Sequence, residues 1–140
     1  MRIEGKVTPP KGRKNRFWGV EIPLLEVYTQ GKSREDAYRM ARDAIESLVN
    51  KKGFSVTITP AKRNLFEVSS DDFATFLAFV LTRLRTSHHL SAREVSERLS
   101  SSSPNAYVRY ERGKAMPKLN TLLQLLRAID PRLSLVLKGA

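Results

Sequence analysis

The chain has 140 residues, which is enough for one domain or for two small ones. It contains no cysteine, and this excludes disulfide frameworks, thiolate metal sites and cysteine nucleophiles. Its 25 Lys and Arg residues outnumber its 14 Asp and Glu residues, and the net charge of +11 predicts a polyanionic partner, most often nucleic acid.

The sequence shows neither a membrane span nor a secretory signal. No apolar run approaches the roughly 20 residues that a bilayer requires, and the first residues include Glu4 but no apolar segment. We therefore expect a soluble, cytoplasmic protein that makes no contact with a membrane.

The first residues of the chain alternate between apolar and polar side chains in the manner of strands. Such runs occur at 3–7, 17–22 and 25–28. The connection at residues 9–15 is basic and rich in turn-forming residues. The pattern predicts an antiparallel meander of three strands with a basic loop between the first two.

A helix and a further strand are predicted next. Ser33 has the position of a helix N-cap, with Asp36 three residues later, and apolar residues then recur at helical spacing until Gly53. Residues 54–59 alternate again, and the run ends at Pro60. Residues 1–68 are thus predicted to form a βββαβ domain.

From residue 69 onward the apolar spacing is helical. The pairs that match the capping-box pattern at helix starts are Ser69 with Asp72 and Ser91 with Glu94. Further helices are predicted at 104–112 and at about 119–129, the latter stopped by Asp130-Pro131. Residues 69–140 are thus predicted to form an all-α domain, and the whole chain is of the α+β class.

The last residues of the chain alternate once more. Leu133, Leu135 and Leu137 occupy every second position, which predicts a short C-terminal strand. Because a lone strand is unstable in water, we expect it to pair with a partner subunit or to fold back on the N-terminal sheet.

Three segments of the second half resemble a DNA-binding motif. They are Leu90-Ser91-Ala92-Arg93-Glu94-Val95-Ser96-Glu97-Arg98-Leu99, then Ser103-Pro104-Asn105-Ala106-Tyr107-Val108-Arg109-Tyr110-Glu111-Arg112-Gly113, and then Pro117 with Leu122-Leu123. Together they resemble the helix-turn-helix of the Cro and lambda-repressor type. The resemblance implies that the second helix of the motif lies in the major groove of DNA and presents polar side chains from its first turns.

The residues of this recognition helix divide between two faces. Ser103 is expected to cap it, Pro104 suits its first position, and Tyr107 and Tyr110 lie on the inner face. Asn105, Ala106 and Arg109 face outward, and Val108 is expected at the edge of the groove. These four residues are the candidate base readers. An Asn side chain can pair bidentately with adenine and an Arg side chain with guanine.

Contacts to the DNA backbone require cations and free amide groups at helix starts. The candidate phosphate-binding residues are Arg93, Arg112, Lys114, Lys118 and Asn120. The resemblance implies a different role for Glu111, which pairs inside the domain with the arginine at the end of the first helix, here Arg85. Such a pair joins helices and does not read DNA.

The sequence departs from the motif at two places. The turn between the two helices is one residue longer than usual, and Ser100 and Ser101 stand where glycine and an apolar residue are common. His89 stands where glycine is frequent, so a left-handed backbone there is tolerated and not favoured.

The first half carries a second resemblance. Its residues are Phe17-Trp18-Gly19-Val20-Glu21-Ile22-Pro23, then Thr29-Gln30-Gly31-Lys32-Ser33, Ala37 and Ala44-Ile45. They resemble the N-terminal domain of HicB antitoxins. The resemblance implies a partial RNase H-like fold that binds and covers the small RNA-cleaving toxin HicA, while a C-terminal domain represses the operon. The symmetry of operators and the predicted C-terminal strand favour a homodimer or a higher homo-oligomer.

Three alternatives remain open from the sequence. An orphan transcription regulator would use its first domain to sense a ligand or to form oligomers. An RNA-binding protein would depend on the basic residues from Lys11 to Arg16. A nuclease would need carboxylates such as those of Glu4 and Glu21 to converge on metal ions.

Catalysis and metal binding are disfavoured by spacing. The helix acids stand at i, i+4 from arginines, as Arg39 and Asp43 do, which is typical of a solvated face. His88 and His89 are adjacent and would project about 100° apart from a helix. We therefore expect no enzyme activity, no metal site and no cofactor.

Overall fold

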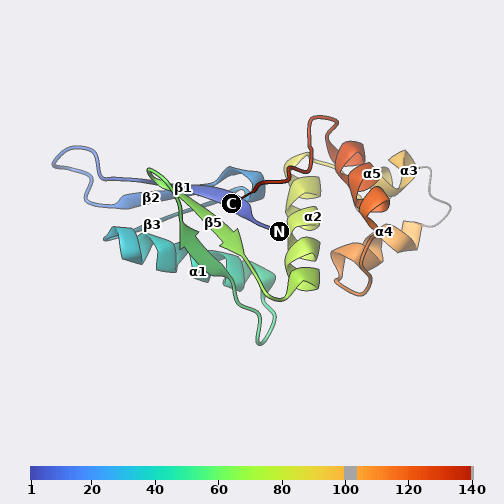
Figure 1. Ribbon diagram of the computed structural model, residues 1–140, viewed down its shortest axis with the longest axis horizontal. Coiled ribbons are helices and arrows are strands. Elements are labelled where there is room, and N and C mark those ends of the chain that lie inside the picture. The colour runs from blue at the N-terminus through green and yellow to red at the C-terminus, as the bar shows by residue number, and fades with distance from the viewer. Residues whose placement is uncertain (100–103, 140) are drawn as a thin grey trace. The chain divides into compact units, whose positions relative to one another are not determined.

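A computed structural model of the chain describes residues 1–99 and 104–139 (Figure 1). The chain divides into two compact units, Met1–Phe76 and Leu77–Ala140, called unit 1 and unit 2 below. The division falls inside the helix α2 (Phe73–Ser87). Across the described parts of the chain, no helix combines the length and apolar character that crossing a membrane requires.

Unit 1 contains one antiparallel sheet of five strands in the order β3-β2-β1-β5-β4 (Figure 1). Its elements are β1 (Ile3–Thr8), β2 (Trp18–Ile22), the short 3-10 helix η1 (Pro23–Leu25), β3 (Val27–Gly31), α1 (Arg34–Val49), β4 (Thr57–Pro60) and β5 (Leu65–Ser69). The expected meander and helix are present. They could be predicted because apolar alternation and the Ser33 cap are local signals.

The predicted βββαβ order is wrong, since the order is βββαββ with β5 as the additional strand. Strand β5 is only five residues long, but Phe66 and Val68 alternate toward the core and are fully buried. It forms a hairpin with β4 and also pairs with β1, so the missed strand lies inside the sheet. Pro60 is tolerated because β4 is an edge strand.

Helix α1 packs against one face of the sheet. Ala37, Ala41 and Ile45 are fully buried and recur every four residues, which places them on one side of the helix. Gly31 allows a close approach, because a Cβ atom there would lie 2.3 Å from the backbone nitrogen of Ala37. The opposite face of the sheet carries exposed side chains, including those of Glu4 and Glu21.

Helix α2 begins later than the capping pattern predicts. Ser69 belongs to β5, where it pairs with Thr57, and so it cannot cap a helix. The cap is Asp72, whose Oδ1 accepts a hydrogen bond of 3.1 Å from the amide of Thr75. Pairing in the sheet thus overrides the local signal at Ser69.

Unit 2 is formed by the rest of α2 with α3 (Ala92–Arg98), α4 (Pro104–Glu111) and α5 (Leu119–Ile129). Its core contains the buried side chains of Leu81, Leu84, Val95, Tyr107, Leu125 and Ile129. Helix α3 packs against both α4 and α5. The second capping box is confirmed, since Ser91 and Glu94 each hydrogen bond to the backbone amide of the other.

The predicted C-terminal strand is wrong for the single chain. Residues 133–139 carry no strand, and the described sheet consists of β1–β5 alone. A strand needs a neighbour for its backbone hydrogen bonds, and the alternation of leucines cannot supply one. Leu135, Val136 and Leu137 are exposed, and their pairing with a partner subunit stays a prediction.

Candidate nucleic-acid interface

The orientation of α4 is fixed by a polar cluster around Arg85. The Arg85 guanidinium donates to both carboxylate oxygens of Glu111, with Nε 2.5 Å from Oε1 and Nη2 3.1 Å from Oε2. Its Nη1 also donates to the carbonyl of Leu90 at 2.8 Å. The pair that the resemblance implies is therefore formed, and it joins the end of α2, the following turn and α4.

Tyr107 completes this cluster from the inner face of α4. Its ring is buried, and its hydroxyl donates to Oε1 of Glu111 at 2.5 Å. Burial raises the pKa of the Tyr107 hydroxyl well above its ordinary value, and the adjacent Glu111 carboxylate raises it further. The phenol therefore stays a hydrogen-bond donor at every physiological pH.

The outer side of α4 carries the candidate base readers. Asn105 and Arg109 are exposed, whereas Ala106 and Val108 are partly buried. Among the residues that the structure describes, Arg109 forms no ion pair. Its guanidinium is thus available for a ligand while Tyr107 anchors the other side of the helix.

The expected cap Ser103 and the unusual residues Ser100 and Ser101 lie outside the described residues. In the turn before α3, His89 has a φ of 55°, the left-handed conformation that a non-glycine residue tolerates there.

The candidate phosphate-binding residues differ in whether their side chains already have a partner within unit 2. Arg112, Lys114 and Lys118 are exposed and form no ion pair within the described parts of unit 2. Arg93 in the first turn of α3 donates to Glu97 at 3.1 Å, but both side chains are highly exposed. The amide oxygen of Asn120 accepts from the backbone of Thr121, so its own amide hydrogens remain available.

A second polar cluster, which the sequence did not reveal, joins the ends of α2 and α5. His88 places Nε2 3.0 Å from Oδ2 of Asp130 and Nδ1 2.7 Å from the carbonyl oxygen of Leu84. The Arg132 guanidinium and backbone amide hold the pKa of the Asp130 carboxyl well below its ordinary value, and His88 lowers it further. From the sequence, Asp130 is predicted only to end the last helix.

Comparison with known proteins bears on unit 2 alone. Residues 81–132 match the family model described as Helix-turn-helix. No curated protein matches the chain. The matched residues include the Arg85–Glu111 pair, α3, α4, α5 and every candidate DNA-contacting residue. The C-terminal unit of this protein therefore contains a helix-turn-helix of the Cro/C1 type, the DNA-binding element of transcription regulators.

Proposed function

We propose that this protein is a transcription regulator that also acts as an antitoxin. Unit 2 binds operator DNA and represses the operon that encodes the protein. In this proposal, unit 1 has a partial RNase H-like fold and covers a small RNA-cleaving toxin of the HicA type. The observation that carries the proposal is the order of two resemblances along one chain: HicB-like segments come first, and a helix-turn-helix follows.

The HicB-like segments lie together in unit 1, which supports the proposal. The run from Phe17 to Pro23 forms β2 and the start of η1, and the run from Thr29 to Ser33 joins β3 to the cap of α1. Strands β2 and β3 pair with each other, with Trp18 opposite Gly31. The two segments are thus one continuous piece of structure.

Unit 1 acts by binding and not by catalysis in this proposal. On the open sheet face Glu21 lies opposite Lys6, while Glu67 lies opposite Glu4 and is bridged by Arg2 at 2.8 Å. Acids and cations therefore alternate on this face, which suits contact with the polar surface of another protein. The toxin that the resemblance to HicB antitoxins implies is typically basic, so the acids are the attractive positions for it.

On helix α1, one of the salt bridges that the i, i+4 spacing predicts is formed, that of Arg39 with Asp43. Arg39 pairs with Asp43 at 3.3 Å and also with Asp36, one turn earlier. Glu46, which the spacing assigned to an arginine, instead accepts a hydrogen bond of 3.0 Å from the amide of Val56. These acids thus have structural partners within unit 1.

Co-expression tests the antitoxin function. The short reading frame next to the gene is induced with and without this protein, and cell growth is measured. We expect growth arrest by the neighbour alone and recovery with the wild-type protein. Recovery is expected to be lost when Glu4→Lys and Glu21→Lys are combined, and to be kept by Arg109→Ala, which alters only the DNA-binding surface. A non-toxic neighbour, or arrest that persists with the wild-type protein, refutes the antitoxin role.

A further inference from the structure

The positive charge of unit 1 is concentrated in two hairpin tips. Residues 1–76 contain 14 basic and 10 acidic residues. Six of the basic residues lie at residues 9–16, between β1 and β2, and at residues 61–64, between β4 and β5. Neither tip contains an acidic residue, and the rest of unit 1 has fewer basic than acidic residues. The six residues, called the basic tips below, are Lys11, Arg13, Lys14, Arg16, Lys62 and Arg63.

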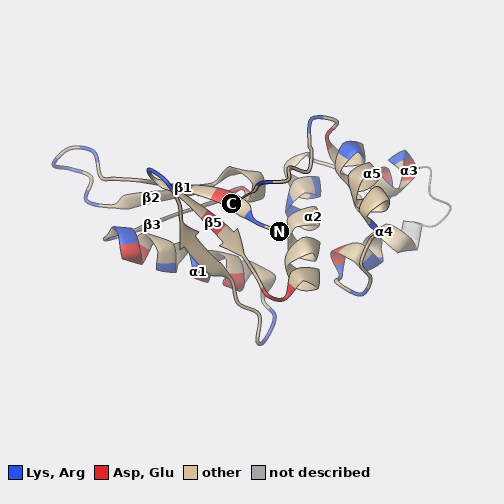
Figure 2. Cartoon of the chain, viewed as in Figure 1, with Lys and Arg blue, Asp and Glu red and all other residues tan. Residues whose placement is uncertain are grey.

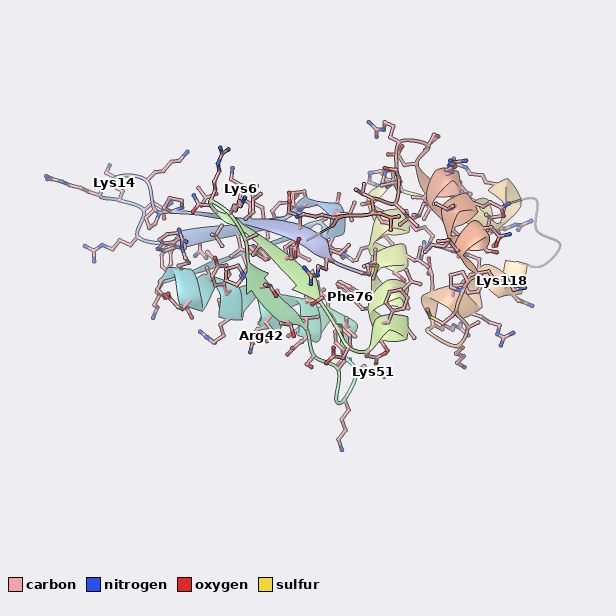
Figure 3. All side chains as sticks on the ribbon, viewed as in Figure 1. Lys6, Lys14, Arg42, Lys51, Phe76 and Lys118 are labelled. Atoms are coloured by element: carbon pink, nitrogen blue, oxygen red, sulfur yellow. The ribbon has the colours of Figure 1, made fainter. Side chains whose placement is uncertain are left out.

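Both tips project from the same end of the sheet. Strand β1 ends where the first tip begins, and β5 runs antiparallel beside it with Lys6 opposite Leu65. The amide of Val7 donates to the carbonyl of Asn64 at 2.8 Å, which attaches the second tip to the end of β1. Figure 2 shows Lys and Arg colours on both turns, and Figure 3 shows Lys14 extending from the first tip.

The base of the tips is attached to the rest of unit 1 by contacts of Asn64 and Trp18, whereas the cations of the tips form no ion pair within the described residues. Arg34 donates to the amide oxygen of Asn64 at 2.9 Å and lies 5.0 Å from the ring centroid of Trp18. All six cations of the basic tips are exposed, and within the described residues none of them forms an ion pair. Elsewhere in unit 1, Arg2, Arg39 and Lys51 are each paired with a carboxylate. Each tip thus gathers two or more unpaired cations in one turn that contains no acidic residue.

We propose that the basic tips bind the phosphate backbone of double-stranded DNA as a second contact that is independent of sequence. Unpaired cations gain affinity for DNA by releasing condensed counterions, and contacts to phosphate carry no sequence information. The helix-turn-helix of the same chain binds the duplex first, and this raises the local concentration of DNA around unit 1. The inference rests on the DNA-binding part of the proposed function. A basic toxin would be repelled from the tips.

The test measures the affinity of the full chain for a random-sequence 40-base-pair duplex by fluorescence anisotropy at several salt concentrations. One variant combines Arg13→Gln with Lys14→Gln, and a second combines Lys62→Gln with Arg63→Gln. Each variant is expected to weaken binding about tenfold or more at 0.1 M salt, and to reduce the slope of log K against log salt by about 2.

The matched control combines Arg42→Gln with Lys52→Gln. It removes the same charge from exposed positions of unit 1 that have no ion pair within the described residues and lie outside the tips, Arg42 on α1 and Lys52 in the turn after it. We expect an affinity within threefold of the wild type, roughly, and an unchanged slope. Tip variants that behave like this control overturn the proposal.

Two further measurements separate the possible causes of failure. A 40-nucleotide single-stranded RNA is the competing probe, and a larger loss for the RNA than for the duplex overturns the assignment to DNA. The Arg109→Ala variant, with intact tips, is expected to lose discrimination between sequences while its salt slope on the random duplex falls by only about 1. Failure of the helix-turn-helix therefore shows as unchanged discrimination, and failure of the tips shows as an unchanged slope in the tip variants.

Discussion

The pair of Arg85 and Glu111 is the residue-level feature on which the recognition helix depends. The two side chains are only 16% and 12% exposed, and their hydrogen bonds are bidentate. A charge left without its partner at such a site is costly, whereas an exposed pair contributes little. The same unit holds such an exposed pair, Arg93 and Glu97, at 85% and 64% exposure.

This contrast gives the first prediction. Glu111→Gln lowers the free energy of unfolding of unit 2 by about 2 kcal/mol, because the Arg85 charge loses its counter-ion in a partly desolvated site. Glu97→Gln is the matched control and costs less than about 0.5 kcal/mol. Urea unfolding of the full chain measures both values. Equal losses would mean that the cluster does not stabilise α4.

Asp72 makes unit 1 sensitive to acid. Hydrogen bonds from Lys51, at 2.9 Å, and from the hydroxyl and amide of Thr75 lower the pKa of Asp72 from 3.8 to about 2. Because the folded-state pKa is the lower one, the stabilisation is complete well above pH 3.8 and is lost as the pH falls toward 2. Asp72→Asn is expected to flatten the stability of unit 1 between pH 4 and pH 2.

The urea midpoint measured from pH 6 to pH 2 tests this dependence. Asp71→Asn is the control, since Asp71 is exposed and forms no ion pair or hydrogen bond within the described residues. That variant should keep the acid sensitivity of the wild type. A profile for Asp72→Asn that superimposes on the wild-type profile contradicts the role assigned to the Lys51 contact.

At the scale of elements, the predictable features are those with local causes. Ser33 and Ser91 cap their helices, and these caps could be predicted because the capping signal spans only three residues. Ser69 belongs to β5 and pairs with Thr57 across a hairpin. Because this pairing depends on contacts between strands, local signals predict neither the role of Ser69 nor the strand β5. The leucine alternation near the C-terminus forms no strand in the single chain, because a strand also needs a neighbouring strand for its backbone hydrogen bonds.

The candidate site follows the same rule. The outward position of Asn105 and Arg109 could be predicted from helical spacing around Tyr107. The Arg85–Glu111 pair spans 26 residues and was accessible only through the resemblance to repressors. The contact between His88 and Asp130 spans 42 residues, and no local pattern announces it.

The close packing of α1 on β3 gives a prediction about one element. A Cβ atom at Gly31 would lie 2.3 Å from the backbone of Ala37, so Gly31→Ala must displace the start of α1. We expect a loss of about 1–3 kcal/mol in the stability of unit 1.

Gly19→Ala is the control within the same sheet, because its nearest neighbour would be 3.8 Å away, an ordinary contact. Urea unfolding of the two variants should separate them clearly. Comparable stabilities would show that α1 can move away from β3 at little cost.

At the scale of the whole molecule, the exposed tail predicts self-association. Leu135, Val136 and Leu137 are exposed in the single chain, and a strand formed from them requires a partner. Combining Leu135→Asp with Leu137→Asp is expected to shift the protein from dimer to monomer, because two charges would be buried at the pairing surface. Ser134→Asp is the control at a neighbouring exposed position. Light scattering after size-exclusion chromatography measures the mass, and a wild-type monomer at micromolar concentration contradicts the prediction.

The charge of +11 is distributed in a way that agrees with two contacts to nucleic acid. Unit 2 carries 11 basic and 4 acidic residues, so it holds the larger share of the excess. In unit 1 the excess is confined to the basic tips, and the remaining surface is slightly acidic. The net charge is therefore the sum of separate local surfaces, and the slightly acidic part of unit 1 outside the tips is compatible with a basic partner.

Reading of DNA by the exposed side of α4 is the central claim, and a gel-shift titration tests it most directly. The probes are a duplex from the region directly upstream of the gene and a shuffled duplex of the same composition. We predict that the wild-type protein prefers the upstream duplex, and that Asn105→Ala and Arg109→Ala each cost about 1–3 kcal/mol of this preference. Arg112→Ala should weaken binding to both duplexes alike. Undiminished preference in the Asn105 and Arg109 variants would contradict the assignment of α4 as the recognition helix.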